Sequence, residues 1–381
     1  MEVVTITIGE LTDFTGQAAP AVANITYVTQ DVARYYNDQN LIPGARVKIA
    51  AYDTKFDPAR ELTGWEWCKA QGAEVIITLI PGTADVLKPF AERDRIVIAA
   101  MGANPDLFDP PGWAFGFSNT TIWSANTLWR WFTENRWDYS QGIPPKIGIV
   151  GWNDPSSVDA KKGAEAYFNS HPGEFDYVGA YISPAGTSTF KSEAVKLKDC
   201  DYVACVSGFA MPYFLRDLRA VGGMAPVVDL IGSMGSYRKF YSDLVGWDVL
   251  DGCLSTANSM YWGDPLPLVE LLEEILYKYR PSEADEIIAG GNGYVGAGHM
   301  AIGIMEALRK AVEDVGAENF NGQAFYDSTE NYSTALSPIW EGYPEWSFSQ
   351  TKHWLMDDTV IVEFQASVQD LVTISDWLPN G

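Results

Sequence analysis

The stretch from Val75 to Pro105 constrains the fold of this chain more than any other. It holds two short runs of apolar and mostly β-branched residues, at 75–79 and 96–100, separated by a segment long enough for one helix. Such runs are typical of strands that are covered on both faces of a parallel sheet, because a half-exposed strand would alternate apolar and polar residues. The stretch therefore predicts a strand, a crossover helix and a second, parallel strand.

The ends of this unit predict a ligand-binding edge. Gly82 and Thr83 begin the helix, so that backbone N–H groups and a hydroxyl point out of the carboxyl end of the sheet, where they suit an anion or a polar group. The second strand continues into Met101, Gly102 and Ala103, a loop of small residues that the chain delivers to the same edge. Open α/β sheets bind ligands at this edge. We expect the two loops to form one wall of a site.

The same alternation of strand and helix patterns extends along most of the chain. Strand patterns occur at residues 4–9, 47–52, 114–117, 146–150, 177–182, 201–206, 227–231 and 252–255, mostly with helical patterns between them. This order is typical of parallel sheets built from βαβ units. Because 381 residues exceed the length at which single cores usually stop growing, we expect two domains.

The last third of the chain departs from this alternation. Residues 265–279 and 293–315 repeat apolar side chains at helical spacing and predict two long amphipathic helices. Residues 354–356 and 359–364 alternate like an antiparallel hairpin that turns at Asp357 and Asp358.

Charge and hydropathy exclude several classes of partner. The chain carries 26 basic and 50 acidic residues, and its formal charge of −24 repels nucleic acid and anionic lipid. No apolar run approaches the roughly 20 residues that span a bilayer, so we expect no membrane insertion of the mature domain. The four cysteines show neither CxxC pairing nor a zinc-type histidine spacing, and we expect buried free thiols.

Motifs for catalysis and cofactors are weak. The glycine pattern that starts at Gly291 has dinucleotide-loop spacing, but no clear strand precedes it, and a closely packed helix start is the better interpretation. The three histidines are scattered, and no GxSxG, HExxH or P-loop motif is present. We therefore predict a protein that is not an enzyme and that needs neither a cofactor nor a metal.

Several short motifs, in this order, resemble those of one family. They are Ile8-Gly9 through Thr15-Gly16, Tyr52-Asp53 with Asp57-Pro58, residues 103–107, residues 185–190 followed by 196–198, and residues 294–308. Together they cover nearly the whole chain. On these residues, the chain resembles the type I periplasmic solute-binding proteins of the branched-chain amino acid ABC transporter family.

The resemblance implies an α/β fold of two Rossmann-like lobes with parallel central sheets, joined by a hinge that the chain crosses three times. The crossings would fall near Ser118, Thr256 and Gln323. The first lobe would then comprise residues 1–118 and 257–323, and the second lobe residues 119–256 and 324–381. In this family a ligand is held between the lobes and the hinge closes on it.

The same resemblance implies which residues line the two walls of that cleft. On the first lobe they are Phe14, Ala21, Thr83, Met101, Gly102 and Ala103. On the second lobe they are Trp152, Ser156, Ser157, Phe209, Ser233 and Tyr237.

The chain departs from the amino acid binders of this family where a carboxylate normally holds the ligand amine. The loop from Gly232 to Ser236 has no acidic residue. Ala103 replaces a threonine, and Ala21 replaces an aromatic residue. A buried ammonium group without a carboxylate would cost several kcal/mol. A neutral or anionic planar solute therefore fits better than a free amino acid, unless Asp13 or another carboxylate serves the amine instead of capping a turn.

These observations predict a solute-binding protein of an ABC importer. It would capture a small organic carboxylate, an amide or an amino-acid-like solute and present it to a membrane permease. The resemblance places it in the periplasm or another extracytoplasmic space after removal of a signal peptide. The alternative is a cytoplasmic ligand-sensing regulator of the amide-sensor type on the same fold, which an upstream signal peptide would exclude.

Overall fold

The computed structural model describes residues 3–16, 19–55, 57–79, 82–101, 105–118, 120–257 and 261–380. The chain divides into two compact units. The first unit comprises Met1–Thr120 and Ser259–Asp357, and the second comprises Thr121–Asn258 and Asp358–Gly381.

The first unit is built on a parallel sheet of five strands. The strands are β1 (Val4–Thr12), β2 (Ala45–Asp53), β3 (Ala73–Thr78), β4 (Val97–Ala100) and β5 (Ala114–Gly116). They follow the order β2-β1-β3-β4-β5, in which Val75 on β3 pairs with Val97 on β4. Since β3 and β4 lie inside this sheet and are almost entirely buried, the apolar runs that predicted them reflect burial on both faces.

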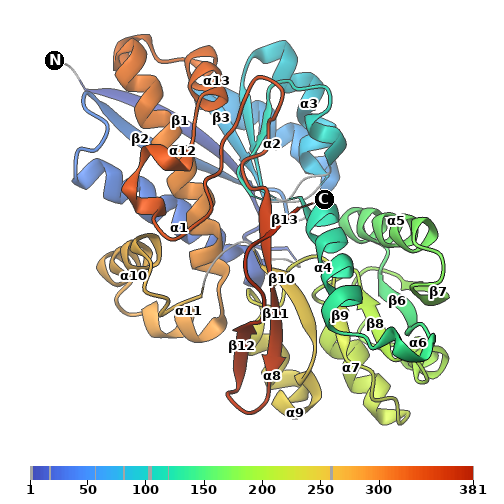
Figure 1. Cartoon of the computed structure of the whole chain (residues 1–381). Helices are drawn as coiled ribbons and strands as arrows, with labels where there is room; N and C mark the ends of the chain where they lie inside the picture. Colours follow the sequence, from blue (N-terminus) through green and yellow to red (C-terminus); the bar gives the residue numbers. More distant parts are fainter. Residues whose placement is uncertain are drawn as a thin grey trace. The chain divides into compact units, whose positions relative to one another are not determined.

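Helices cover the two faces of this sheet. On one face, α2 (Glu61–Ala70) and α3 (Thr83–Asp94) form a core with the strands that includes Leu11, Trp65, Ile76, Leu87 and Ile98. A second group of helices packs together (Figure 1): α1 (Ala19–Asp38), α10 (Pro267–Tyr279), α12 (Gly293–Val315) and α13 (Gly322–Glu330). The short helix α11 (Ala284–Gly290) precedes α12, so a helix and not a strand leads into the glycine pattern at Gly291.

The second unit is built on a mainly parallel sheet. The strands are β6 (Lys146–Trp152), β7 (Asp176–Ser183), β8 (Tyr202–Cys205), β9 (Val227–Asp229), β10 (Leu254–Ala257), β11 (Asp358–Gln365), β12 (Asp370–Thr373) and β13 (Leu378–Pro379). Their order is β12-β11-β10-β9-β8-β6-β7, and β13 pairs with β11. Strand β11 runs antiparallel to β10, β12 and β13, whereas β6 to β10 are parallel.

Helices again flank this sheet on both faces. Helices α4 (Thr121–Asn135) and α5 (Pro155–Ser170) share one core with the strands, in which Trp129 is fully buried. Helix α6 (Lys191–Leu197) packs so closely on the other face that a Cβ atom at Gly148 would lie 2.1 Å from a methyl carbon of Leu197. The remaining helices are α7 (Met211–Ala220), α8 (Arg238–Val245) and α9 (Trp247–Leu250).

The predicted third crossing near Gln323 differs from the observed division. Residues 324–357 belong to the first unit. Ser328 on α13 donates to the Ala307 carbonyl at 2.9 Å, and the Leu355 N–H donates to the Gly116 carbonyl at 2.8 Å. These bonds attach α13 to α12, and residues 353–355 to the edge strand β5. The chain passes to the second unit only after Asp357.

The predicted hairpin of residues 354–364 is wrong, because its two halves belong to different units. Trp354 forms a parallel bridge with Gly116, whereas β11 pairs with β10, β12 and β13. The observed hairpin joins β11 to β12 through a turn at residues 366–369. Asp357 instead pairs with Lys352 and accepts a hydrogen bond from the Trp354 indole N–H at 2.8 Å.

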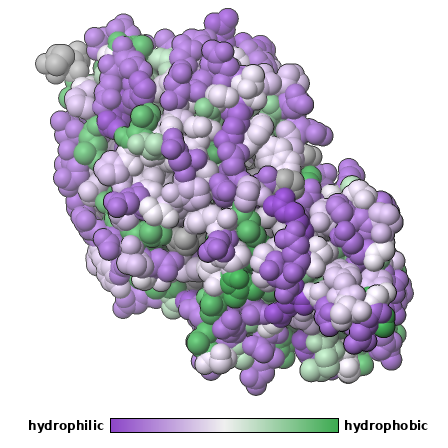
Figure 2. Space-filling view, viewed as in Figure 1, coloured by the Kyte–Doolittle hydropathy of each residue, from purple (hydrophilic) through white to green (hydrophobic). Residues whose placement is uncertain are grey.

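The cysteines and the helices can also be compared with the predictions. All four cysteines are buried free thiols, as the sequence predicted. No helix in the described part of the chain is both long and apolar enough to cross a bilayer. Figure 2 shows mainly hydrophilic residues on the face in view.

Candidate functional site

The loop after β1 is held by two aspartates. Asp13 is buried, and its Oδ1 accepts hydrogen bonds from the N–H groups of Thr15 and Gly16. Asp53, at the end of β2, accepts from the Phe14 N–H at 3.0 Å and from the Thr15 hydroxyl at 2.7 Å. Asp13 therefore caps the turn, which was the alternative to a role in binding an amine. These bonds leave the Phe14 ring 44% exposed beside the carboxyl end of the sheet.

Thr83 lies at the start of α3, as predicted. The residue before it, Gly82, has a left-handed backbone with φ 88° and, as a glycine, has no side chain that could cap the helix. The first turn therefore offers N–H groups at the carboxyl end of β3. Met101 is half-buried, and its N–H donates to the Thr78 carbonyl at 3.0 Å. Gly102 and Ala103 lie outside the described residues, as does the side chain of Ala21.

Two buried glutamates in the first unit were not predicted. Glu10 on β1 and Glu61 at the start of α2 are 0% and 2% exposed. Burial raises the pKa of Glu10 to about 8 and the pKa of Glu61 to about 7. A signal was present for Glu61, because it shares the helical face of Gly64, Trp65 and Cys68, which are all buried.

Three aromatic side chains predicted for the site form a row in the second unit. The Trp152 and Phe209 rings are stacked with centroids 6.2 Å apart, and the Phe209 and Tyr237 rings lie 4.8 Å apart. Trp152 is the last residue of β6, and Phe209 and Tyr237 lie in the segments after β8 and β9. The carboxyl ends of these three parallel strands meet at one edge of the sheet. The Trp152 indole N–H donates to the Thr187 carbonyl at 2.9 Å, which fixes that end of the row. All three rings remain partly exposed.

The predicted serines of the second unit are engaged in hydrogen bonds inside the protein. Ser156 and Ser157 each donate their hydroxyl to the Asp154 carboxylate at 2.6 Å, and Asp154 also caps α5 through the Ser157 N–H. The Ser233 hydroxyl donates to Asp229 at 2.9 Å and also contacts the Tyr241 hydroxyl at 3.0 Å. These hydroxyls shape the edge of the sheet, and their bonds leave little capacity for a ligand.

Asp229 organises the loop that follows β9. Its buried carboxylate accepts hydrogen bonds from the N–H groups of Ile231, Ser233 and Met234 and from the hydroxyls of Ser233 and Ser255. Burial raises the pKa of Asp229, although these bonds act in the opposite direction. A carboxylate thus lies three residues before Gly232, but its acceptor sites are occupied by the loop itself.

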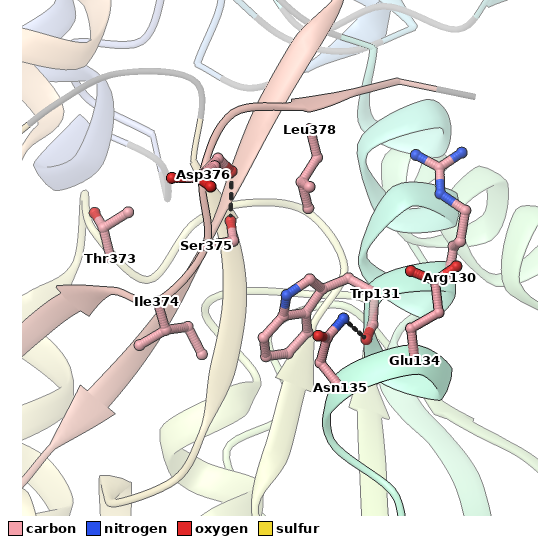
Figure 3. A pocket seen from close by; sticks show the side chains of 9 residues that line it. All are labelled: Arg130, Trp131, Glu134, Asn135, Thr373, Ile374, Ser375, Asp376 and Leu378. Atoms are coloured by element: carbon pink, nitrogen blue, oxygen red, sulfur yellow. Dashed lines mark hydrogen bonds between the residues drawn. The ribbon is translucent and has the colours of Figure 1, made fainter.

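The second unit also has an open hollow of about 630 Å³ away from this edge. Figure 3 shows its lining, which comes from α4 and from the segment of residues 373–378, between the end of β12 and the start of β13. Trp131, Arg130 and Glu134 contribute from α4, and Asp376 and Leu378 from the segment. None of the predicted site residues lines it.

Two mainly parallel sheets, with polar loops and aromatic side chains at their carboxyl edges, define a two-unit α/β binding protein. A family model described as "Periplasmic binding protein" matches residues 5–368. The chain belongs to the periplasmic binding protein family. Members of this family bind solutes and are not enzymes, as the sequence predicted.

Solved structures show the same fold at low sequence identity. A branched-chain amino acid ABC transporter protein from Thermus thermophilus with bound valine has a TM-score of 0.86 and 17% identity, with 100% of this chain and 98% of that chain covered. A solute-binding protein from Rhodopseudomonas palustris BisB5 in complex with 3,4-dihydroxybenzoic acid has a TM-score of 0.76 and 14% identity, covering 99% and 98%. A fatty acid ABC transporter substrate-binding protein from Thermomonospora curvata has a TM-score of 0.78 and 15% identity, covering 99% and 93%. No curated protein sequence matches this chain.

Proposed function

We propose that this solute-binding protein serves an ABC importer. It would work outside the cytoplasm, capturing a small planar carboxylate or amide and delivering it to a membrane permease. The ligand would be held between the carboxyl edges of the two sheets, and closure of the hinge would enclose it. The proposed walls are the twelve residues that the sequence analysis assigned, with the three serines acting as supports for their loops.

The observation that most supports a planar ligand is the aromatic row of Trp152, Phe209 and Tyr237. Flat apolar faces suit an aromatic or conjugated solute, because offset stacking adds about 0.5–1.5 kcal/mol per ring pair to the effect of burial. Next to the row, the carboxylates of Asp154 and Asp229 are occupied by hydroxyl and N–H groups. They are poorly placed to hold an ammonium group.

The first unit supports the same ligand class. The start of α3 offers N–H groups and the Thr83 hydroxyl, which suit a carboxylate or a carbonyl oxygen. Asp13, the acidic side chain that the sequence offered as a partner for an amine, is buried and bonded to its own turn. One of the proteins with the same fold holds 3,4-dihydroxybenzoic acid, which is an acid of this kind.

Calorimetry on ligand-stripped protein tests the proposal. We expect 3,4-dihydroxybenzoate, benzoate or benzamide to bind more tightly than valine, leucine or isoleucine. Phe209→Ala should weaken binding of the aromatic ligands. Phe240→Ala changes a neighbouring ring outside the proposed wall, and as the matched control it should leave their binding unchanged. Micromolar or tighter binding of a branched-chain amino acid, with no response to the acids and the amide, would refute this ligand class.

A further inference from the structure

Tyr241 lies next to the aromatic row but is itself fully buried. It is on α8, and its side chain is 0% exposed, so it is not one of the rings that a ligand can contact. Its ring centroid lies 6.1 Å from that of Tyr237 and 6.2 Å from that of Phe364 on β11. Because the ring is enclosed by the core of the second unit, the position of its hydroxyl group is fixed.

The Tyr241 hydroxyl connects the two loops that carry Phe209 and Tyr237. It donates a hydrogen bond to the carbonyl of Gly208, directly before Phe209 in the loop after β8, at 2.9 Å. It also lies 3.0 Å from the hydroxyl of Ser233, in the loop after β9. One buried group therefore links the loops that follow two neighbouring strands of the sheet.

The two loops approach each other closely at this link. A Cβ atom at Gly208 would overlap the Ser233 Oγ and would lie 3.0 Å from the Tyr241 hydroxyl oxygen. Any larger residue at this position would push the loop after β8 away from both hydroxyls. Glycine thus allows a single tyrosine hydroxyl to bridge the loops.

Asp229 anchors the other side of the link to the sheet. The hydroxyls of Ser233 and of Ser255 on β10 both donate to its carboxylate at 2.9 Å. A series of hydrogen bonds therefore runs from Gly208 through Tyr241, Ser233 and Asp229 to Ser255, across the ends of β8, β9 and β10. All five residues are buried, so water does not replace these bonds at low cost.

We propose that Tyr241 is a positioning residue that holds the Phe209 and Tyr237 rings 4.8 Å apart and thereby makes the site selective for flat ligands. The inference rests on the proposed function, in which the aromatic row lines the wall that meets the solute. A flat ring contacts both side chains favourably only while the two loops keep their spacing. A puckered ring of the same charge depends less on this spacing, because it cannot stack on an aromatic face.

Tyr241→Phe tests this inference, because it removes the hydroxyl and keeps the ring. The probes are benzoate and cyclohexanecarboxylate, which carry the same charge on a flat and on a puckered ring, titrated by calorimetry into ligand-stripped protein. Affinity for benzoate should fall roughly two- to tenfold, which corresponds to the loss of one hydrogen bond, whereas affinity for cyclohexanecarboxylate should change little.

Tyr177→Phe is the matched control for this substitution. It also removes a tyrosine hydroxyl that donates a hydrogen bond, to Glu165 at 2.8 Å, but it does so near the amino end of β7. Both affinities should therefore equal those of the wild type.

A double-mutant cycle separates positioning from a general structural role. In the Phe209→Ala background, Tyr241→Phe should have no further effect on benzoate affinity, because the ring that it positions is absent. Ser233→Ala, which removes the other end of the link, should reproduce the selective loss of benzoate. Wild-type benzoate affinity in Tyr241→Phe, an equal loss for both acids, or the same loss with and without Phe209 would overturn the inference. The proposed function would remain intact, since the wild type still binds the acid.

Hydrogen exchange of the ligand-free protein decides the case in which the wild type binds neither the acids nor benzamide, which refutes the proposed function. The N–H groups of Ala210 and Tyr237 are bonded within the two loops, to the carbonyls of Ser207 at 3.1 Å and Ser233 at 3.2 Å. Both should exchange faster in Tyr241→Phe than in the wild type, because the loops open more easily, and Tyr177→Phe should leave them unchanged. Unchanged protection in Tyr241→Phe would overturn the positioning role of its hydroxyl.

Discussion

The buried carboxyl group of Glu10 makes the stability of the first unit depend on pH. Glu10 lies near the carboxyl end of β1 and is 0% exposed. Neither of its oxygens makes a hydrogen bond of normal geometry to the residues that the structure describes, although the hydroxyls of Thr26 and Thr29 on α1 lower its pKa somewhat. Burial dominates and raises the pKa from 4.5 to about 8. The folded protein therefore keeps a proton that the unfolded chain releases.

The sign and the size of the effect follow from linkage. Below pH 4.5 both states are protonated and Glu10 costs no ionisation energy. As the pH rises from 4.5 to about 8, unfolding releases a proton, so the free energy of unfolding falls. One pKa unit corresponds to about 1.4 kcal/mol, which gives a loss of roughly 5 kcal/mol as an upper bound over the whole range. Above pH 8 the loss remains constant.

Glu10→Gln tests this reasoning, because the amide has nearly the same shape and does not titrate. Urea unfolding at pH 5, 6, 7 and 8, followed by tryptophan fluorescence and circular dichroism, should show the variant gaining stability relative to wild type by up to about 1.4 kcal/mol per pH unit. Glu341→Gln, an exposed change in the same unit, should show no such gain. A constant difference between Glu10→Gln and wild type would refute a raised pKa at Glu10.

Three further predictions concern the binding site and its supports. Thr83→Ala should weaken 3,4-dihydroxybenzoate binding by roughly 0.5–3 kcal/mol in calorimetry while leaving the circular dichroism spectrum unchanged, and wild-type affinity would remove Thr83 from the site. Asp229→Asn should lower stability by roughly 1–3 kcal/mol in urea unfolding, because five donors share its carboxylate, whereas the exposed Asp243→Asn should have little effect. Saturation with ligand should reduce the radius of gyration in small-angle scattering, and an unchanged value would count against closure of the hinge.

Local patterns were enough to predict most of the regular elements. The helix at residues 293–315 was predicted with the observed bounds and the helix at residues 265–279 within two residues, because apolar residues recur in both at helical spacing. Strands β3 and β4 were predicted within two residues at each end, because buried parallel strands are marked by continuous apolar runs. The resemblance to the family, and not a local pattern, assigned Trp152, Phe209 and Tyr237 to one wall, and the contacts between their rings are a result of the tertiary structure.

What the sequence by itself determined is the set of strands and helices, the parallel sheets and the edge at which their loops meet, because these depend on the spacing of apolar residues along the chain. Only the tertiary structure decided which segments pair across long distances. Residues 353–355 join β5 and residues 358–365 join β10, although alternation alone suggested that they pair with each other. Tertiary packing likewise decided that Glu10 and Glu61 are buried and that Asp154 and Asp229 are occupied by serine hydroxyls. Burial and hydrogen-bond partners depend on residues far apart in the chain, so the protonation of a carboxyl group is a property of the fold.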